Sequence, residues 1–335
     1  MYYKLLFTIT LMIGTLITVS SYSWMGMWMG LEINLLSMIP LISDSKNMMA
    51  SEAALKYFII QTMASTMLLF SIIMMSMKFM YQMNLITYFN LMFNTSLLTK
   101  MGAAPFHFWF PEVMEGLNWL NAMIMLTWQK LSPMVLLTYS NSTSLYLIMA
   151  ILFSMTISGI MGLNQTSLRK ILAYSSINHI GWMISSILLI EIIWLYYFII
   201  YSIITINITS MFYKFNIFHV NQLYISMNQN LMFKLFFILN FLSLGGLPPF
   251  LGFFPKWLTI QTLIQSNLFS IAFIMIIMTL MTLYFYLRIT FSTFLLTKTM
   301  LSFYKQPKIN NNYLLAFNLI SLSSLILTTF MFNFL

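Results

Sequence analysis

Long apolar runs separated by short polar segments constrain this chain more than any other feature of its sequence. A helix of about 20 apolar residues, at 1.5 Å per residue, crosses the hydrocarbon core of a bilayer, which is about 30 Å thick. Only 6% of the residues are charged, which is too few to cover the surface of a water-soluble globule. The pattern therefore predicts an all-α polytopic membrane protein of about eleven transmembrane helices, folded as a single transmembrane domain over residues 1–335.

The polar segments also define the individual spans and their orientation. We expect helices near residues 3–20, 24–43, 51–76, 83–104, 117–139, 144–163, 168–190, 192–214, 231–265 (interrupted), 268–295 and 313–334. Ten basic residues at loops and span ends fall on the N-terminal side, against Lys78 alone on the other side. The ten are Lys4, Lys46, Lys56, Arg169, Lys170, Lys214, Lys234, Lys298, Lys305 and Lys308. By the positive-inside rule the N-terminus faces the cytoplasm-equivalent compartment, and an odd number of spans puts Leu335 on the opposite side.

The sequence lacks the residues that several cofactors and ligands require. It contains no Cys, which excludes disulfides, Cys-ligated iron–sulfur clusters and Cys-based zinc sites. The methionines are spread along the whole chain, unlike those of Met-rich metal motifs. No phosphate-binding loop or dinucleotide fingerprint is present, so neither ATP nor NADH is expected to bind. Basic residues occur singly between apolar runs, which argues against nucleic acid. We expect no cofactor and no metal in this chain.

One glycine- and proline-containing motif occurs twice. Residues 102–112 and 246–256 share the pattern Gly-x-x-Pro-Phe-x-x-x-Phe-Pro at an offset of 144 positions. Because proline removes a backbone donor and clashes with the preceding turn, we expect broken helices near 100–112 and 244–257. The motifs lie five predicted spans apart, which gives the two units opposite orientations.

The sequence therefore predicts two inverted five-helix repeats, 1–140 and 144–295, followed by a C-terminal helix at 313–335. Paired broken spans mark the transport site of inverted-repeat transporters. Recurrence by chance in a biased composition is the alternative.

A few charged residues fall inside the predicted spans. Glu32 lies near mid-span, Lys100 precedes the first break, Lys130 lies mid-span and Lys256 follows the second break. A charge at that depth costs at least about 2.5 kcal/mol unless it faces the bundle interior or water, and such residues are usually functional. Burial disfavours the charged form, so a small change in a neighbouring charge loads or unloads a proton. These four residues are the candidate proton-handling groups, and snorkelling to the interface is the alternative for the lysines.

Two histidines and a group of carboxylates complete the candidates. His179 and His107 are candidate proton relays, with a structural hydrogen bond as the alternative reading of each. Glu52 and Lys56 are spaced i, i+4 and are expected to form a structural ion pair. Glu112 and Glu115 either favour the following helix start or line an exit. Arg288, near a span end, is expected to snorkel.

Several segments then carry a family resemblance: Met29 to Leu36, Ser51 to Phe58, Lys100 to Trp109, Leu126 to Lys130, Gly162 to Lys170, Leu244 to Pro249 and Pro255 to Trp257. Together they resemble the NADH-ubiquinone oxidoreductase chain 2 family, mitochondrially encoded antiporter-like core subunits of respiratory complex I, in an insect or related invertebrate form.

The resemblance implies a subunit of the H⁺-translocating NADH:ubiquinone reductase (EC 7.1.1.2) in the mitochondrial inner membrane, with the N-terminus in the matrix and the C-terminus in the intermembrane space. It implies that Glu32 and Lys100 form an ion pair, that Lys130 is a central lysine and that Lys256 serves the second broken helix. FMN, iron–sulfur clusters and ubiquinone would reside in partner subunits. The implied partners are subunit 4, subunit 4L, the lateral helix of subunit 5, accessory subunits and phospholipids such as cardiolipin.

The leading hypothesis is therefore a proton-translocating subunit whose Lys and Glu residues respond to quinone reduction elsewhere. One alternative is a free-standing cation/proton antiporter subunit. The other is a passive membrane-arm scaffold in which the charges only hold helices together.

Overall fold

The computed structural model describes residues 2–44, 47–77, 83–140, 144–227, 231–295 and 318–319. Within these residues the chain forms fourteen helices and one isolated β-bridge, between Ser167 and His219. It divides into two compact units, 1–154 and 155–335. The predicted helix at 313–335, apart from helical residues 318–319, lies outside the described residues, as do Lys46, Lys78, Lys298, Lys305 and Lys308.

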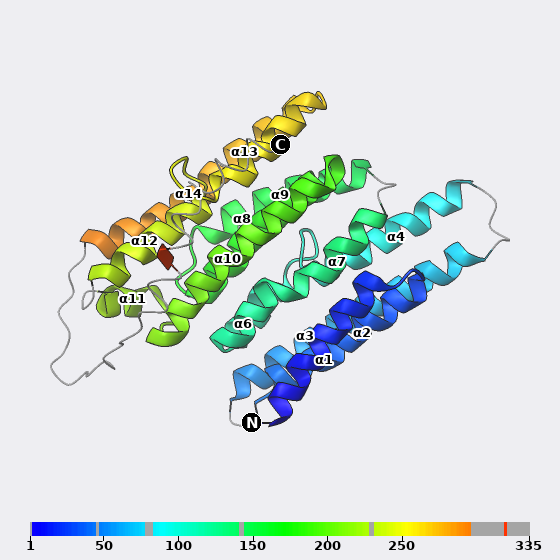
Figure 1. Cartoon of the computed structure of the whole chain (residues 1–335), viewed down its shortest axis with the longest axis horizontal. Coiled ribbons are helices and arrows are strands. Elements are labelled where there is room, and N and C mark those ends of the chain that lie inside the picture. The colour runs from blue at the N-terminus through cyan, green and yellow to red at the C-terminus, as the bar shows by residue number, and fades with distance from the viewer. Residues whose placement is uncertain are drawn as a thin grey trace. The chain divides into compact units, whose positions relative to one another are not determined.

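The first unit is a bundle of long helices with short helical pieces packed among them (Figure 1). Its helices are α1 (Tyr2–Ser20), α2 (Trp24–Ile42), α3 (Met48–Ser76), α4 (Met83–Met101), α5 (Trp109–Gly116), α6 (Trp119–Leu126) and α7 (Trp128–Tyr139). α1 packs on α2, α3 contacts α2, α4 and α5, and α7 packs on α4. This arrangement surrounds α7 with α1, α2 and α4.

The division between the units falls within α8 (Ser144–Gly162). The second unit continues with α9 (Leu168–Leu189), α10 (Glu191–Phe215), α11 (Val220–Met227), α12 (Leu231–Gly245), α13 (Phe253–Gln265) and α14 (Phe269–Leu295). α9 is buried along almost its whole length and contacts α10, α13 and α14. It forms the core of this unit, so its polar residues face protein. The short helix α11 lies in a segment predicted as a loop.

Six helices are long and apolar enough to cross a membrane by length and composition: α1, α2, α3, α8, α10 and α14. They establish an all-helical, multi-pass membrane protein. α9 is long enough to span but carries buried polar residues including Ser175, Ser176, Asn178 and His179. Such residues lower hydropathy and are tolerated inside a bundle, where neighbouring helices provide hydrogen-bond partners.

The two repeated motifs interrupt helices at matching positions. α4 ends at Met101 and α5 begins at Trp109, while α12 ends at Gly245 and α13 begins at Phe253. The next residue after each first helix is a glycine with positive φ, +72° at Gly102 and +78° at Gly246. Glycine adopts this left-handed conformation at no steric cost and commonly ends helices. The predicted breaks are therefore present in both helices.

The prediction of one continuous helix at 117–139 is wrong in one respect. These residues form two helices, α6 and α7, that meet at Thr127. The Thr127 hydroxyl donates to the carbonyl of Met123 (2.8 Å), a side-chain bond that competes with the helix and bends it. Pro133 then lies within α7, where it removes a backbone donor. The interruption places Lys130 in the first turn of α7.

Candidate functional site

The three lysines predicted within spans are all buried. Their exposed fractions are 8% for Lys100, 1% for Lys130 and 6% for Lys256. Lys100 lies in the last turn of α4, Lys130 in the first turn of α7 and Lys256 in the first turn of α13. Each lysine thus lies beside a helix interruption. Arg288, by contrast, is exposed near the end of α14.

Glu32 lies on α2 in the same unit as Lys100 and is half-buried. Its carboxylate attracts the Lys100 ammonium through space. No direct ion pair joins these two side chains in the described part of the chain. The ion pair that the family resemblance implies is therefore a longer-range interaction in this structure.

Lys130 has an aromatic neighbour supplied by the first break. Its ammonium lies 5.3 Å from the ring centroid of Phe110, a cation–π distance. Phe110 belongs to α5 and contacts Gly102, because a Cβ added at that glycine would meet the Phe110 Cβ at 3.1 Å. The broken motif thus helps to position the surroundings of Lys130.

Two small cavities lie beside Lys100, and one of them also reaches Lys130. The first, which we call the Asn34 cavity, has a volume of about 20 Å³ and is lined by residues including Asn34, Lys100, Gln129 and Ser132. The second, the Phe110 cavity, has a volume of about 10 Å³ and is lined by residues including Lys100, Phe110, Gln129 and Lys130. A buried water needs about 10–15 Å³ of such space. Each cavity is therefore about the size of one water.

The Asn34 cavity also holds polar atoms that lack a hydrogen-bond partner. In the described part of the chain, Asn34 Oδ1 and Gln129 Nε2 are buried and form no hydrogen bond. Asn34 Nδ2 donates to Ser132 Oγ at 3.4 Å, which orients the amide. A buried water typically satisfies about three otherwise unpaired polar groups. The cavity therefore has the size and the lining that an ordered water requires.

Lys256 has different surroundings in the second unit. Its ammonium donates to the carbonyl of Gly245 at 2.9 Å and of Leu244 at 3.4 Å. These carbonyls end α12, where helix carbonyls lack intrahelical donors and carry partial negative charge. The ammonium also lies 6.0 Å from the ring centroid of Trp182 on α9. Lys256 thus caps the first half of its own broken helix.

His179 lies on α9, three residues before Trp182 and therefore on the same face of the helix. Its Nδ1 is 2.8 Å from the Tyr197 hydroxyl, and its ring centroid is 5.0 Å from that of Tyr201. This contact is the structural hydrogen bond expected as the alternative to a relay, and it comes from a tyrosine on α10. A hydroxyl and an imidazole in contact are able to exchange a proton.

His107 has a more local environment, between α4 and α5. Its Nδ1 lies 3.3 Å from the Pro105 carbonyl, and its ring lies 4.3 Å from that of Phe108. It is buried but lines neither the Asn34 cavity nor the Phe110 cavity. These contacts favour the structural reading of His107, as part of the turn that joins α4 to α5.

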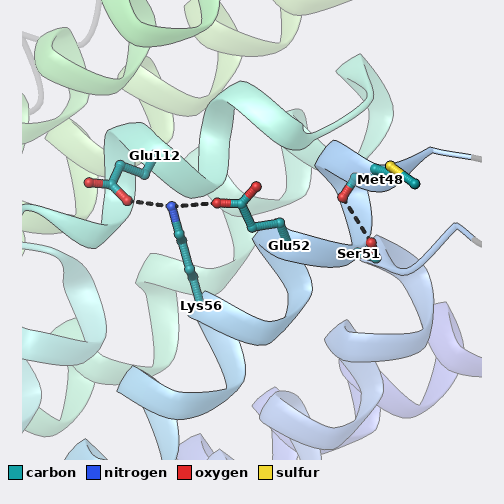
Figure 2. A network of polar contacts seen from close by, with 5 residues as sticks. All are labelled: Met48, Ser51, Glu52, Lys56 and Glu112. Carbon is teal, nitrogen blue, oxygen red and sulfur yellow. Dashed lines mark hydrogen bonds and ion pairs between the residues drawn. The ribbon is translucent and has the colours of Figure 1, made fainter.

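The predicted ion pair of Glu52 and Lys56 forms, at 2.9 Å, and extends to a third residue (Figure 2). Lys56 Nζ also lies 2.8 Å from Glu112 Oε2. All three side chains are exposed. Glu112 lies in the first turn of α5, so the network ties α3 to this turn. The sequence indicated the pair along α3 but gave no sign of the longer-range partner.

Sequence reasoning also missed Asn34, Gln129, Trp182 and Tyr197. Two of them were signalled by position, since Asn34 follows Glu32 by two residues and Gln129 precedes Lys130. The aromatic pair carried no signal, because Trp and Tyr are common throughout the chain. Within the described residues, no group of three or more His, Cys, Asp or Glu side chains gathers where it could hold a metal ion.

Comparisons with known proteins give one consistent result. Residues 21–282 match the family model described as NADH:quinone oxidoreductase/Mrp antiporter, transmembrane. The chain is 48% identical to the NADH-ubiquinone oxidoreductase chain 2 of Anopheles gambiae, over 98% of this chain and 97% of that protein. It is 50% identical to the chain 2 of Aedes aegypti, over 98% and 97%.

A solved structure shares the fold. A chain of respiratory complex I from Thermus thermophilus, determined with bound aureothin, superposes with a TM-score of 0.87 at 20% identity. The superposition covers 98% of this chain and 79% of that chain.

Proposed function

Since the chain belongs to the NADH-ubiquinone oxidoreductase chain 2 family, and so is a membrane subunit of proton-pumping respiratory complex I, we propose that its buried charges form a proton-translocation path. The path consists of Glu32, Lys100, Lys130 and Lys256. Quinone reduction in other subunits would drive it by changing the charge state of these residues in turn.

The main support is the Phe110 cavity, which both Lys100 and Lys130 line. A water in it would provide hydrogen-bonding groups between the two ammonium groups. Lys100 and Gln129 also line the Asn34 cavity, where a second water would extend the hydrogen bonds from Lys100 to Asn34. Burial favours the neutral form of Lys100, and the negative charge of Glu32 opposes this, so the two forms compete. A proton arriving at Lys130 would favour the neutral form of Lys100 further by like-charge repulsion. The two lysines would therefore exchange a proton in response to neighbouring charge.

In the second unit the proton carrier would be Lys256, with His179 as a possible relay. The His179 contact with the Tyr197 hydroxyl and its position one turn from Trp182 support this role. His107 retains its relay role only as a second candidate, because its contacts are local.

We also infer the finer membrane arrangement. The six apolar spans, together with α4, α9 and the interrupted pairs α6–α7 and α12–α13, bring the number of crossings to ten. A helix at 313–335 would make eleven. Residues 1–140 and 144–295 would be inverted repeats, with the N-terminus in the matrix and the C-terminus in the intermembrane space of the mitochondrial inner membrane. The clustering of basic residues on one side supports this orientation.

The proposed neighbours are subunit 4, subunit 4L, the lateral helix of subunit 5, accessory subunits and phospholipids such as cardiolipin. FMN, iron–sulfur clusters and ubiquinone would be bound by partner subunits, which carry electrons from NADH to ubiquinone. This chain would contribute proton movement and no redox centre.

Lys130→Met in the assembled complex tests the proposal. Methionine has a similar volume, so packing is kept while the exchangeable proton is lost. We expect fewer protons pumped per electron pair or blocked turnover, measured by quinone reduction together with acidification in sealed vesicles. Lys4→Met, which removes an exposed lysine, is the matched control. Normal stoichiometry and rate in Lys130→Met would overturn the proposal.

A double variant separates the path from a passive scaffold. Exchanging the charges, with Glu32→Lys and Lys100→Glu together, preserves their attraction but places the carboxylate at the cavities. A scaffold tolerates the exchange. The proton path predicts loss of pumping with the complex still assembled.

A further inference from the structure

A polar pocket in the second unit lies away from the lysines of the proposed path. It has a volume of about 610 Å³, within the range of small-molecule sites. Most of its lining residues carry hydrogen-bonding side chains; the lining is Asn164, Gln165, Thr166, His219, Val220, Asn221, Tyr224, Arg288 and Ile289. None of the lining residues is acidic. The proposed proton path uses none of them.

The walls of the pocket are built by backbone contacts between two loops. The loop before α9 and the loop before α11 form an antiparallel bridge at Ser167 and His219. Leu168 N donates to the Phe218 carbonyl at 2.9 Å, and Val220 N donates to the Thr166 carbonyl at 3.2 Å. α14 contacts α11 and contributes Arg288. The polar groups are therefore held in place by the fold.

The second unit contains a single acidic residue, Glu191, and it lies far from this pocket. Glu191 is the last acidic residue in the sequence, and the 144 residues that follow it contain none. It begins α10, which ends near Lys214; that helix is about 36 Å long at 1.5 Å per residue. The pocket is lined by residues that follow the far end of α10, among them His219 and Asn221. Among the described residues of the second unit, no carboxylate therefore lies near Arg288, and an anionic ligand would supply the opposite charge.

The surface beside Arg288 indicates which molecule. α14 exposes large apolar side chains on both sides of Arg288, including Tyr284 at 58% and Phe291 at 59%. An exposed apolar helix face at a membrane boundary accommodates acyl chains. A guanidinium with neighbouring amides and a hydroxyl binds phosphate oxygens through charge-assisted hydrogen bonds. One class of ligand carries both acyl chains and a phosphate group.

We propose that this pocket binds the phosphate headgroup of an anionic phospholipid, with Arg288 as the charged contact and the acyl chains lying along the exposed face of α14. Asn164, Gln165 and Asn221 would provide hydrogen bonds to the headgroup. The site requires that the chain lie in a membrane, as proposed above, but it does not require the proton path. Each proposal can therefore fail without the other.

The test uses photoactivatable phosphatidylglycerol, with the reactive group in an acyl chain near the headgroup, and the assembled complex in phosphatidylcholine vesicles. We expect adducts on α14 and on residues 219–224, identified by peptide mass spectrometry. Arg288→Gln should lower the yield at sub-saturating lipid about fivefold, the factor expected for one basic residue near an anionic membrane surface. Arg288→Lys, which keeps the charge but not the planar donors, should lose less.

Controls distinguish the other possible ligands. Lys4→Gln removes an exposed positive charge in the first unit and should leave the yield unchanged. Unlabelled phosphatidylglycerol should compete, while phosphatidylcholine and inorganic phosphate should not. The proposal is overturned if Arg288→Gln gives the wild-type yield, if phosphatidylcholine competes equally, or if inorganic phosphate displaces the lipid. Absence of adducts at this pocket, with adducts elsewhere on the complex, would also overturn it and favour an acidic partner subunit.

Discussion

The two broken helices end in the same way and differ in the groups that satisfy their last carbonyls. At both breaks a glycine with positive φ follows the last turn, and the same pair of backbone hydrogen bonds closes the helix end. In the first unit Gly102 N donates to Thr99 O and Ala103 N donates to Leu98 O. In the second unit Gly246 N donates to Ser243 O and Leu247 N donates to Leu242 O. The next free carbonyl is that of Lys100 in the first unit and that of Leu244 in the second. Gln61 donates to the former, at 3.4 Å, and Lys256 to the latter, at 3.4 Å.

In the first unit, different side chains cap the helix end and act as the proposed proton carrier, whereas in the second unit one lysine does both. In the first unit neutral donors cap the helix end, since the Trp109 indole also donates to Thr99 O at 3.1 Å. The side chain of Lys100 is then left to line the cavities. In the second unit one ammonium both caps α12 and is the candidate proton carrier. A change in the charge of Lys256 therefore acts directly on the helix break, whereas a change at Lys100 does not.

The largest expected effect comes from Lys256→Met. It removes the donor to the Gly245 and Leu244 carbonyls, and each buried carbonyl left without a donor costs about 1–3 kcal/mol. We expect a reduced amount of assembled complex and no pumping from what remains. Lys100→Met should also abolish pumping but should assemble normally, because its helix end keeps its caps. Native gels and proton-to-electron ratios measure the two effects separately.

Lys256→Gln serves as the matched variant for that comparison. Its amide keeps a donor near the end of α12 but carries no exchangeable charge, so assembly should recover while pumping does not. Equal assembly of Lys256→Met and Lys100→Met would break the comparison, since capping by Lys256 would then contribute nothing.

Gln129→Met tests the same comparison in the first unit. It removes an amide that lines both cavities of the first unit and that makes no hydrogen bond through Nε2 among the described residues. A water there would lose one hydrogen bond, worth about 1 kcal/mol, and proton transfer should slow up to about tenfold. Stability should be unchanged or slightly raised.

The measurement for Gln129→Met is the pumping rate as a function of pH, with the thermal midpoint as the structural readout. Gln129→Asn, which keeps a shorter amide, should recover part of the rate. An unchanged rate would mean that these cavities do not carry the proton.

Trp109→Phe tests the neutral cap directly. Phenylalanine keeps an aromatic ring but loses the indole donor to Thr99 O, at a cost of about 0.5–1.5 kcal/mol. We expect a lower thermal inactivation midpoint with a normal proton-to-electron ratio. Trp128→Phe is the control, because the Trp128 indole makes no hydrogen bond within the part of the chain that the structure describes. A changed ratio in Trp109→Phe alone would show that the cap and the lysine are coupled after all.

The sequence predicted the elements whose signals are local. Apolar run length indicated the long helices, and Gly102 and Gly246 with their prolines indicated both breaks. The split of the predicted span 117–139 at Thr127 was missed, because a threonine within an apolar helix is ordinarily tolerated. The lysines were found because a charge within an apolar run is rare, and all three are buried.

The missing part consists of contacts between segments far apart in the chain. Asn34 and Ser132 meet across 98 residues, and no spacing rule predicts that they line one cavity with Lys100. The donor that caps α12 could not be predicted either. Lys256 lies 11 residues after Gly245, and a segment of that length can turn the lysine either toward the carbonyls of α12 or away from them. Such pairs depend on how helices pack, which the apolar pattern alone does not determine.

The smallest expected effect belongs to the residue that occupies the position of Lys256 in the first repeat. Glu112 aligns with Lys256 at the offset of 144, but its carboxylate is exposed and pairs with Lys56 at 2.8 Å. Exposed ion pairs contribute about 0.2–1 kcal/mol and are screened by salt. Glu112→Gln should therefore lower the thermal midpoint slightly at low salt and hardly at all at high salt, with pumping unchanged. Glu52→Gln, which removes the other carboxylate on Lys56, should match it. A loss of pumping in Glu112→Gln but not in Glu52→Gln would mean that Glu112 and Lys256 both handle protons. The two breaks would then differ in the sign of the charge at this position and not in its function.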